Sequence, residues 1–286
     1  MLKLLLCLSL IPLKVFSCTE PGVGFLPNNN RKYAVDFKNA GLTIEQYHAA
    51  INKFEKVYAP IAQRFGARLQ VERKWESETV NAGTFRGNAG KTWVINLYGG
   101  YARHPATTSD SYLLVMCHEI GHHIGGAPKK VYESGTHWAS TEGQSDYYAT
   151  LKCLRKIFRY DNNGEIVRDL EIPESIRSEC ASSFSSPTEY SLCLRTSLAG
   201  LAVSKVNADI RNMPEPEIDI VDSNIVSATS NNHPVPQCRL NTYFQGALCS
   251  VSARRPVSQV NEVQGTCHVS QSFTSGLRPG CWYKPK

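Results

Sequence analysis

A long amphipathic helix is the clearest element that the hydrophobic pattern predicts. Apolar residues recur after Thr43 at alternating spacings of three and four, the period of one face of an α-helix. They are Ile44, Tyr47, Ile51, Phe54, Tyr58, Ile61 and Phe65. Gln46 follows Thr43 at the spacing of a capping box. We therefore expect a helix that begins after Thr43 and packs one face against a core.

Three β-prone segments follow this helix. Residues 67–75, 79–86 and 91–98 are rich in β-branched and aromatic side chains, and Gly and Asn turns separate them. Each segment has the length of an ordinary strand. They predict a small sheet between the first helix and the helices that come later in the chain.

Further helices are predicted in the second half of the pattern. One carries apolar residues at helical spacing, namely Leu113, Cys117, Ile120 and Ile124, and stops at the glycine pair that begins with Gly125. Another begins near Ser140 or Thr141 and continues to about Phe158, and a third lies around residues 192–206. Helices and strands that are segregated in this way predict an α+β fold.

The helix that ends at Gly125 contains the sequence His-Glu-Ile-Gly-His. His118 and His122 are four positions apart, so one helical face presents both imidazoles at a spacing that suits a zinc ion. Glu119 lies beside the first histidine and can take a proton from a water in the site. An accidental match has odds on the order of 1% in a chain of this composition, so we interpret the motif as a metal site.

Three candidates could supply the third ligand of this site. A third histidine would follow Gly125 in one class of zinc peptidase, but Pro128 stands at that position and cannot bind zinc. His137 is a second candidate, in a loop. Glu142 and Asp146 are the third, because they share one face of the next helix. We favour Glu142 as the ligand of a single Zn²⁺, with an open position for water, and Asp146 as the hydrogen-bond acceptor of one zinc histidine.

These motifs resemble those of a known family. HEIGH followed by EGQSD is similar to the gluzincin metallopeptidases, in which His-Glu-x-x-His is joined by Glu-x-x-x-Asp on the next helix. Within the gluzincins, the HtpX-like and CAAX prenyl protease group, with soluble periplasmic members, resembles the chain most. That group also carries His-Pro and a later Arg, which His233, Pro234 and Arg239 match here. The resemblance covers residues 94–158 and 231–250.

The resemblance implies a zincin-like fold and roles for several residues. His233 would lie near the zinc, where it either stabilises the oxyanion or caps the metal, and Arg239 would orient that segment. The strand Trp93 to Leu97 would offer its edge to an extended peptide. Cys117 points away from the zinc face of its helix, so we expect it and Cys153 to pack or to form a disulfide.

Export is predicted by the first residues and by the cysteines. Residues 1–17 have a basic start and a short apolar run, as in a signal peptide, and Cys18 follows as a candidate lipid anchor of a bacterial lipoprotein. Without Cys7 and Cys18, eight cysteines remain and can pair completely; they are Cys117, Cys153, Cys180, Cys193, Cys238, Cys249, Cys267 and Cys281. We expect a disulfide-bonded protein in the cell envelope, either in the periplasm or attached to a membrane, or a secreted one.

Charge and length limit the remaining classes of function. The formal charge of +6 falls to +4 when Lys3 and Lys14 leave with the signal peptide, and no basic run suggests a nucleic-acid partner. We divide the chain into the signal peptide, a metallopeptidase domain at residues 18–250 and a cysteine-containing tail at residues 251–286. The predicted function is a zinc endopeptidase that acts on a protein or peptide. The alternatives are a non-catalytic envelope scaffold with structural zinc and a chaperone-like envelope protein that retains the site.

Overall fold

The computed structural model describes residues 24–38 and 41–285 of the chain. The strands are β1 (Arg68–Lys74), β2 (Ala82–Gly87), β3 (Thr92–Tyr98), β4 (Lys129–Tyr132) and β5 (Gly135–Ser140). The α-helices are α1 (Ile44–Arg64), α2 (Gly99–Ala102), α3 (Ser109–Ile124), α4 (Glu142–Tyr148), α5 (Arg155–Ile157), α6 (Asn163–Ile166), α7 (Glu174–Ser183), α8 (Pro187–Ile210) and α9 (Pro236–Leu248). Short 3₁₀ turns are η1 (Asn88–Gly90) and η3 (Val269–Gln271), and η2 (Ala149–Leu154) is a π-helical segment. The predicted α+β class is confirmed.

The helix α1 begins as its sequence predicts. The Thr43 hydroxyl accepts a hydrogen bond from the Gln46 N–H, and the Gln46 side chain accepts one from the Thr43 N–H, which completes the capping box. Tyr47 and Phe54 are among the fully buried residues on its inner face. Phe65 instead follows the last turn and is 56% exposed, so the apolar face ends one turn earlier than predicted.

The main sheet has the order β1-β3-β2, with β3 parallel to β1 and antiparallel to β2. The prediction that the strand Trp93 to Leu97 offers a free edge is therefore wrong, because β3 has a partner on each side. Its nearly continuous apolar sequence is typical of a central strand that is buried on both faces. The edge on the side of β2 is the one that reaches the metal-binding motif.

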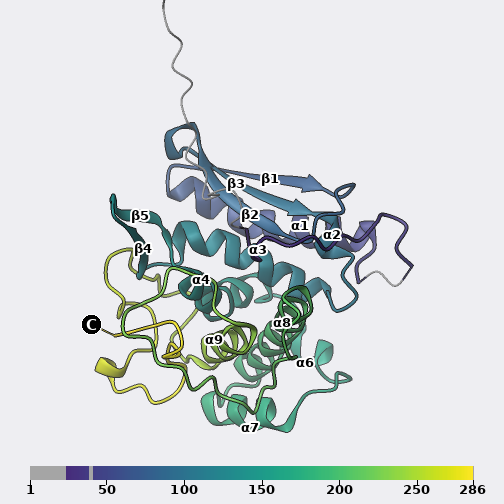
Figure 1. Cartoon of the computed structure of the whole chain (residues 1–286). Coiled ribbons are helices and arrows are strands. Elements are labelled where there is room, and N and C mark those ends of the chain that lie inside the picture. Colours follow the sequence, from purple (N-terminus) through teal and green to yellow (C-terminus); the bar gives the residue numbers. More distant parts are fainter. Residues whose placement is uncertain (1–23, 39–40, 286) are drawn as a thin grey trace, which may run out of the picture.

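The helix α3 lies at the centre of the molecule. Figure 1 shows the sheet and α1 above it and α4, α8 and α9 below it. Thr108 caps its first turn by accepting a hydrogen bond from the Ser111 N–H. Gly121 lets α4 approach closely, since a Cβ atom there would lie 3.1 Å from the Ser145 Cα. This close crossing brings the two predicted motifs together.

The segment after α3 contains elements that the sequence pattern did not predict. A hairpin, β4 and β5, precedes α4, and α7 and α9 lie in regions for which we predicted no helix. The helix predicted from Thr141 to about Phe158 is present as α4, η2 and α5 in succession, with Thr141 as its N-cap. Pro236 occupies the first turn of α9, where proline is tolerated because that N–H has no helical partner.

Four disulfides join the eight cysteines that we expected to pair. They are Cys117–Cys153, Cys180–Cys193, Cys238–Cys281 and Cys249–Cys267. The first joins α3 to η2, and the last two attach the C-terminal tail to α9 and its end. Such a set indicates an oxidising environment. The predicted signal peptide and the candidate lipid anchor at Cys18 lie outside the described residues.

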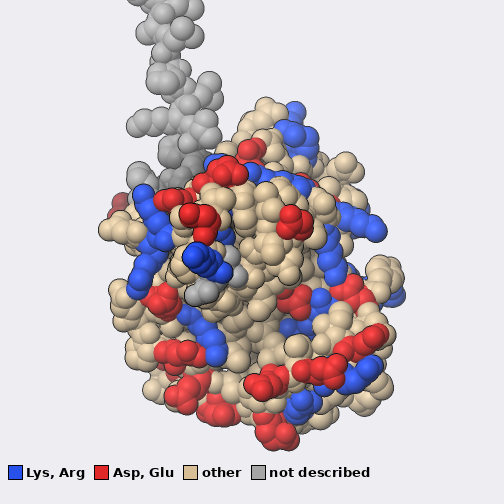
Figure 2. All heavy atoms as spheres, turned by 90° about the vertical axis from the view of Figure 1, so that its right-hand side faces the viewer, with Lys and Arg blue, Asp and Glu red and all other residues tan. Residues whose placement is uncertain are grey.

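Two further observations concern the surface. Among the described residues, the helices are too short or too polar to cross a membrane. The face drawn in Figure 2 carries both signs of charge, with acidic side chains gathered toward the lower end, where Figure 1 draws α7.

Candidate metal centre

His118, His122 and Glu142 form a buried group whose ligand atoms lie within 4.8 Å of one another. The two Nε2 atoms are 3.1 Å apart, and the Glu142 Oε2 lies 3.2 Å from the His118 Nε2 and 3.6 Å from the His122 Nε2. Ligands about 2.0 to 2.1 Å from a tetrahedral zinc ion stand about 3.3 to 3.4 Å apart. The three atoms therefore have the spacing that such an ion requires.

Each histidine is held so that its Nε2 faces the other. The His118 Nδ1 donates to the Asp146 Oδ1 at 2.7 Å, and the His122 Nδ1 donates to the Ser140 carbonyl at 2.9 Å. Because one nitrogen of each neutral ring carries the proton, both Nε2 atoms present lone pairs. Two lone pairs at this separation repel unless a cation lies between them. Without a metal, a proton takes that place: burial lowers the pKa of His118, but the charge of Asp146 outweighs it and raises the pKa to about 9.

Glu142 divides its two oxygens between two tasks. Its Oε1 accepts a hydrogen bond from the Lys130 Nζ at 2.6 Å. Its Oε2 is buried and lacks a well-aligned hydrogen bond among the described residues; its contacts are ion pairs with the Nε2 atoms of His118, His122 and His233, at 3.2, 3.6 and 3.2 Å. A buried carboxylate oxygen that is not fully hydrogen-bonded is costly. A metal ion bound to Oε2 would remove that cost, so the residues present fit a divalent cation.

Glu119 faces the same site from α3. Together with six other residues, namely Gly24, Gly83, Thr84, His122, Lys130 and Glu142, it lines a hollow of about 10 Å³. That volume holds about one water molecule. The Glu119 Oε1 is buried without a hydrogen-bond partner among the described residues, and burial raises the pKa of its carboxyl to about 7. A group with this pKa can accept and release a proton near neutral pH.

Asp146 lies at the centre of a buried polar network. Arg239 donates to both of its oxygens, at 2.9 and 2.7 Å, and the Tyr243 hydroxyl donates to its Oδ1 at 2.6 Å. Burial alone would raise the pKa of Asp146, but the guanidinium charge outweighs burial and keeps the pKa below its usual range. Asp146 therefore stays ionised and fixes the proton of His118 on Nδ1.

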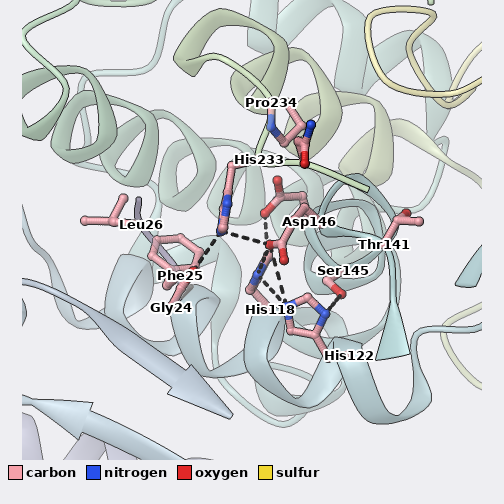
Figure 3. A network of polar contacts seen from close by, with 12 residues as sticks. Gly24, Phe25, Leu26, His118, His122, Thr141, Ser145, Asp146, His233 and Pro234 are labelled. Atoms are coloured by element: carbon pink, nitrogen blue, oxygen red, sulfur yellow. Dashed lines mark hydrogen bonds and ion pairs between the residues drawn. The ribbon is translucent and has the colours of Figure 1, made fainter. Parts of the chain in front are cut away.

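His233 approaches the metal group from the loop before α9. Figure 3 shows its ring turned toward those of His118 and His122, with Gly24 beside it. Its Nε2 lies 3.2 Å from the Glu142 Oε2 and 2.7 Å from the Gly24 carbonyl oxygen, yet it is not a member of the three-ligand group. His233 thus stands next to the site. His137, the other candidate ligand, lies on β5 outside the group and contacts Tyr132 and Trp138 instead.

Some residues of the site carried no signal in the sequence. Lys130 and Tyr243 lie on elements that the pattern did not predict, β4 and α9. Phe25 packs its ring against His118 with centroids 4.8 Å apart, and its carbonyl accepts a hydrogen bond from Arg239. Arg239 and Tyr243 are four positions apart, and that spacing would have placed both on one face had the helix been recognised.

No family model, curated protein or solved structure matches the chain. The resemblance to the gluzincin peptidases therefore rests on the short motifs that contain His118, Glu142 and His233. The geometry supports the same residues independently, because it brings their side chains to one buried place.

Proposed function

We propose that the chain is an exported zinc endopeptidase with a zincin-like, gluzincin-type site. The observation that carries this proposal is the arrangement of His118, His122 and Glu142 at tetrahedral spacing beside Glu119. Structural zinc sites close with a fourth protein ligand, whereas catalytic ones keep a position for water. Here the hollow lined by His122, Glu142 and Glu119 has room for about one water. The four disulfides support the exported location.

The residues of the chain have separate tasks in this proposal. A bound zinc ion would act as the Lewis acid that polarises a peptide carbonyl. Glu119 takes the proton from the attacking water and passes it to the leaving amine, which its pKa of about 7 allows. His233 donates a hydrogen bond from Nε2 toward the developing charge, in place of the one it now gives to the Gly24 carbonyl.

The substrate in this proposal is an extended peptide beside β2. This strand is an edge of the main sheet. The Phe25 N–H donates a hydrogen bond of 2.8 Å to the carbonyl of Ala82, the first residue of β2. Among the described residues no other strand covers the remaining edge. Thr84 lies on that edge and lines the hollow with Glu119. A peptide added there by backbone pairing would present a carbonyl to the site.

The replacement of Glu119 by glutamine tests the proposal. Glu119→Gln keeps the size of the side chain and leaves the metal ligands intact, so the zinc content should stay at about one per chain. Turnover of an unstructured protein substrate should fall by about 10²- to 10⁴-fold, the contribution of a positioned general base. The matched control is Glu174→Gln on the exposed start of α7, which should cleave like the wild type.

Two results would contradict the proposal. If Glu119→Gln cleaves as fast as the wild type with its zinc in place, Glu119 is not the base. If the zinc-loaded wild type cleaves no denatured protein at any pH between 5 and 9, the non-catalytic alternatives replace the peptidase. Addition of a chelator to the active wild type provides the remaining control, because it should stop cleavage without any substitution.

A further inference from the structure

Lys130 is a buried cation that the proposed mechanism does not use. It lies on β4, and its side chain is 6% exposed. Burial of an ammonium group is costly unless an anion receives it. The Lys130 Nζ lies 2.6 Å from the Glu142 Oε1, which is the oxygen that faces away from the two imidazoles. Lys130 therefore contacts a carboxylate that is also a proposed metal ligand.

The β4–β5 hairpin is irregular at Lys130. Its ladder pairs Lys129 with Ser140 and Val131 with Thr136, so Lys130 alone stands opposite the three residues between Thr136 and Ser140. Irregularities of this kind recur beside functional sites. The same hairpin supplies the Ser140 carbonyl that fixes His122. This hairpin therefore orients one proposed metal ligand, His122, and places the Lys130 cation next to another, Glu142.

The contact divides the oxygens of Glu142 unequally. A free carboxylate can bind a metal through both oxygens, which raises the coordination number and fills the open position. Here the ammonium group occupies Oε1, so Oε2 alone is left for a metal. The ammonium group also partly neutralises the negative charge of Glu142. It adds positive charge to a hollow that Glu119 and Glu142 would otherwise make strongly anionic.

We propose that Lys130 is a positioning residue that restricts Glu142 to one-oxygen metal ligation and lowers metal affinity in exchange for an open coordination position. This inference rests on the proposed metal site but not on peptide cleavage. The inference predicts that removal of Lys130 strengthens metal binding. A lysine that served only to stabilise the fold would, when removed, leave metal binding unchanged or weaker. A lysine that competes with the metal for the carboxylate and repels it would, when removed, leave metal binding stronger.

The test uses the full mature chain, Co²⁺ as a visible probe and Zn²⁺ competition titration at pH 8. In Lys130→Met, Glu142 is free to bind through both oxygens, so the visible absorption of bound Co²⁺ should fall toward that of a higher-coordinate ion. The dissociation constant for zinc should decrease by at least about tenfold, because a unit charge a few ångströms from a divalent ion repels it appreciably even in a water-like dielectric. Lys130→Arg keeps the charge and the donors and should restore both wild-type values.

The controls separate this inference from the proposed function. Lys205→Met removes a half-exposed lysine that pairs with Glu215 on the surface, and it should change neither measurement. A Lys130→Met protein with the Co²⁺ spectrum and zinc affinity of the wild type would overturn the inference, as would weaker zinc binding in both Lys130 variants. If Lys130→Met does not fold, loss of the wild-type Co²⁺ spectrum in Lys130→Arg overturns it. Absence of peptide cleavage would overturn the proposed function and leave this inference standing.

Discussion

Glu142 and Asp146 lie one turn apart on α4, are both fully or almost fully buried, and differ in how their oxygens are satisfied. Both oxygens of Asp146 accept hydrogen bonds, from Arg239, Tyr243 and His118. Only one oxygen of Glu142 accepts a well-aligned hydrogen bond, and the other makes only ion pairs with imidazole nitrogens. The same chemical group therefore serves as a fixed structural anion at one position and as an available ligand at the next.

The difference has a structural origin. Asp146 faces α9, a helix whose third and seventh residues past Pro236 provide a guanidinium and a hydroxyl from a rigid backbone. Glu142 faces the β4–β5 hairpin, which supplies one lysine. A completely satisfied buried network holds its members in place, whereas a partly satisfied one stores free energy that a bound ion can release. The comparison predicts that damage to the Asp146 side will affect the fold and damage to the Glu142 side will affect metal binding.

The largest expected effect is that of Arg239→Met. This change leaves the buried Asp146 carboxylate without its cation, and loss of one partner of a buried pair typically costs about 3 to 5 kcal/mol in the free energy of unfolding. Urea denaturation at pH 7 measures it. Lys130→Met should destabilise the metal-bound protein much less, since the ion then compensates Glu142. Equal losses in the two metal-bound variants would contradict the comparison.

The pH dependence of that loss follows from the pKa of Asp146. Arg239 keeps this pKa below its usual range, so the pair contributes stability above the unfolded pKa of about 4, and the contribution is lost as the pH falls through the folded pKa. In Arg239→Met, burial instead favours the protonated acid. The difference in stability between wild type and variant should therefore narrow as the pH is lowered from 7 to 4. A difference that is constant over this range would show that Arg239 acts through packing and not through the charge of Asp146.

The next effect concerns the coupling between the two sides, through His118. Asp146→Asn removes the anion that holds the His118 proton on Nδ1 and should weaken zinc binding by about 10- to 100-fold. Because the change also leaves Arg239 without its anion, the double variant Asp146→Asn, Arg239→Met is the control, and it should show the same weakened affinity. Zinc competition titration of both proteins provides the measurement. Wild-type affinity in the double variant would mean that Arg239, and not Asp146, acts on the metal site.

The sequence predicted the helical parts of this arrangement better than the parts that complete it. His118, Glu119 and His122 could be placed because a fixed spacing on one helix determines a common face. Thr141 marked the start of α4 and hence the position of Glu142. The partner residues could not be found in the same way, since Lys130 lies at a register shift in a short hairpin, and such a shift has no periodicity to read.

The sequence pattern was also insufficient to predict the order of strands in the main sheet. Residues 91–98 were identified as a strand from their composition, but their neighbours in the sheet depend on contacts between distant segments. β1 pairs directly with β3 in parallel, although β2 lies between them in the sequence. Periodicity gives the existence of a strand and the faces of its side chains; it does not give its place in the sheet order. The wrong assignment of an edge to Trp93–Leu97 came from the resemblance to the gluzincins, and the periodicity of the segment could not correct it.

The smallest expected effect is that of Tyr243→Phe. The change removes one hydroxyl, which donates to the Asp146 Oδ1 at 2.6 Å, while Arg239 and His118 continue to donate to the same carboxylate. We expect a loss of about 1 kcal/mol in the free energy of unfolding, since the aspartate keeps its charge partner and the ring keeps its packing. In a chain of this size the loss should lower the Tm by about 2 to 4 °C. Zinc affinity should change by less than about threefold, because the His118 Nδ1 retains its acceptor. A larger loss of zinc affinity would show that the Tyr243 hydroxyl orients Asp146 toward His118.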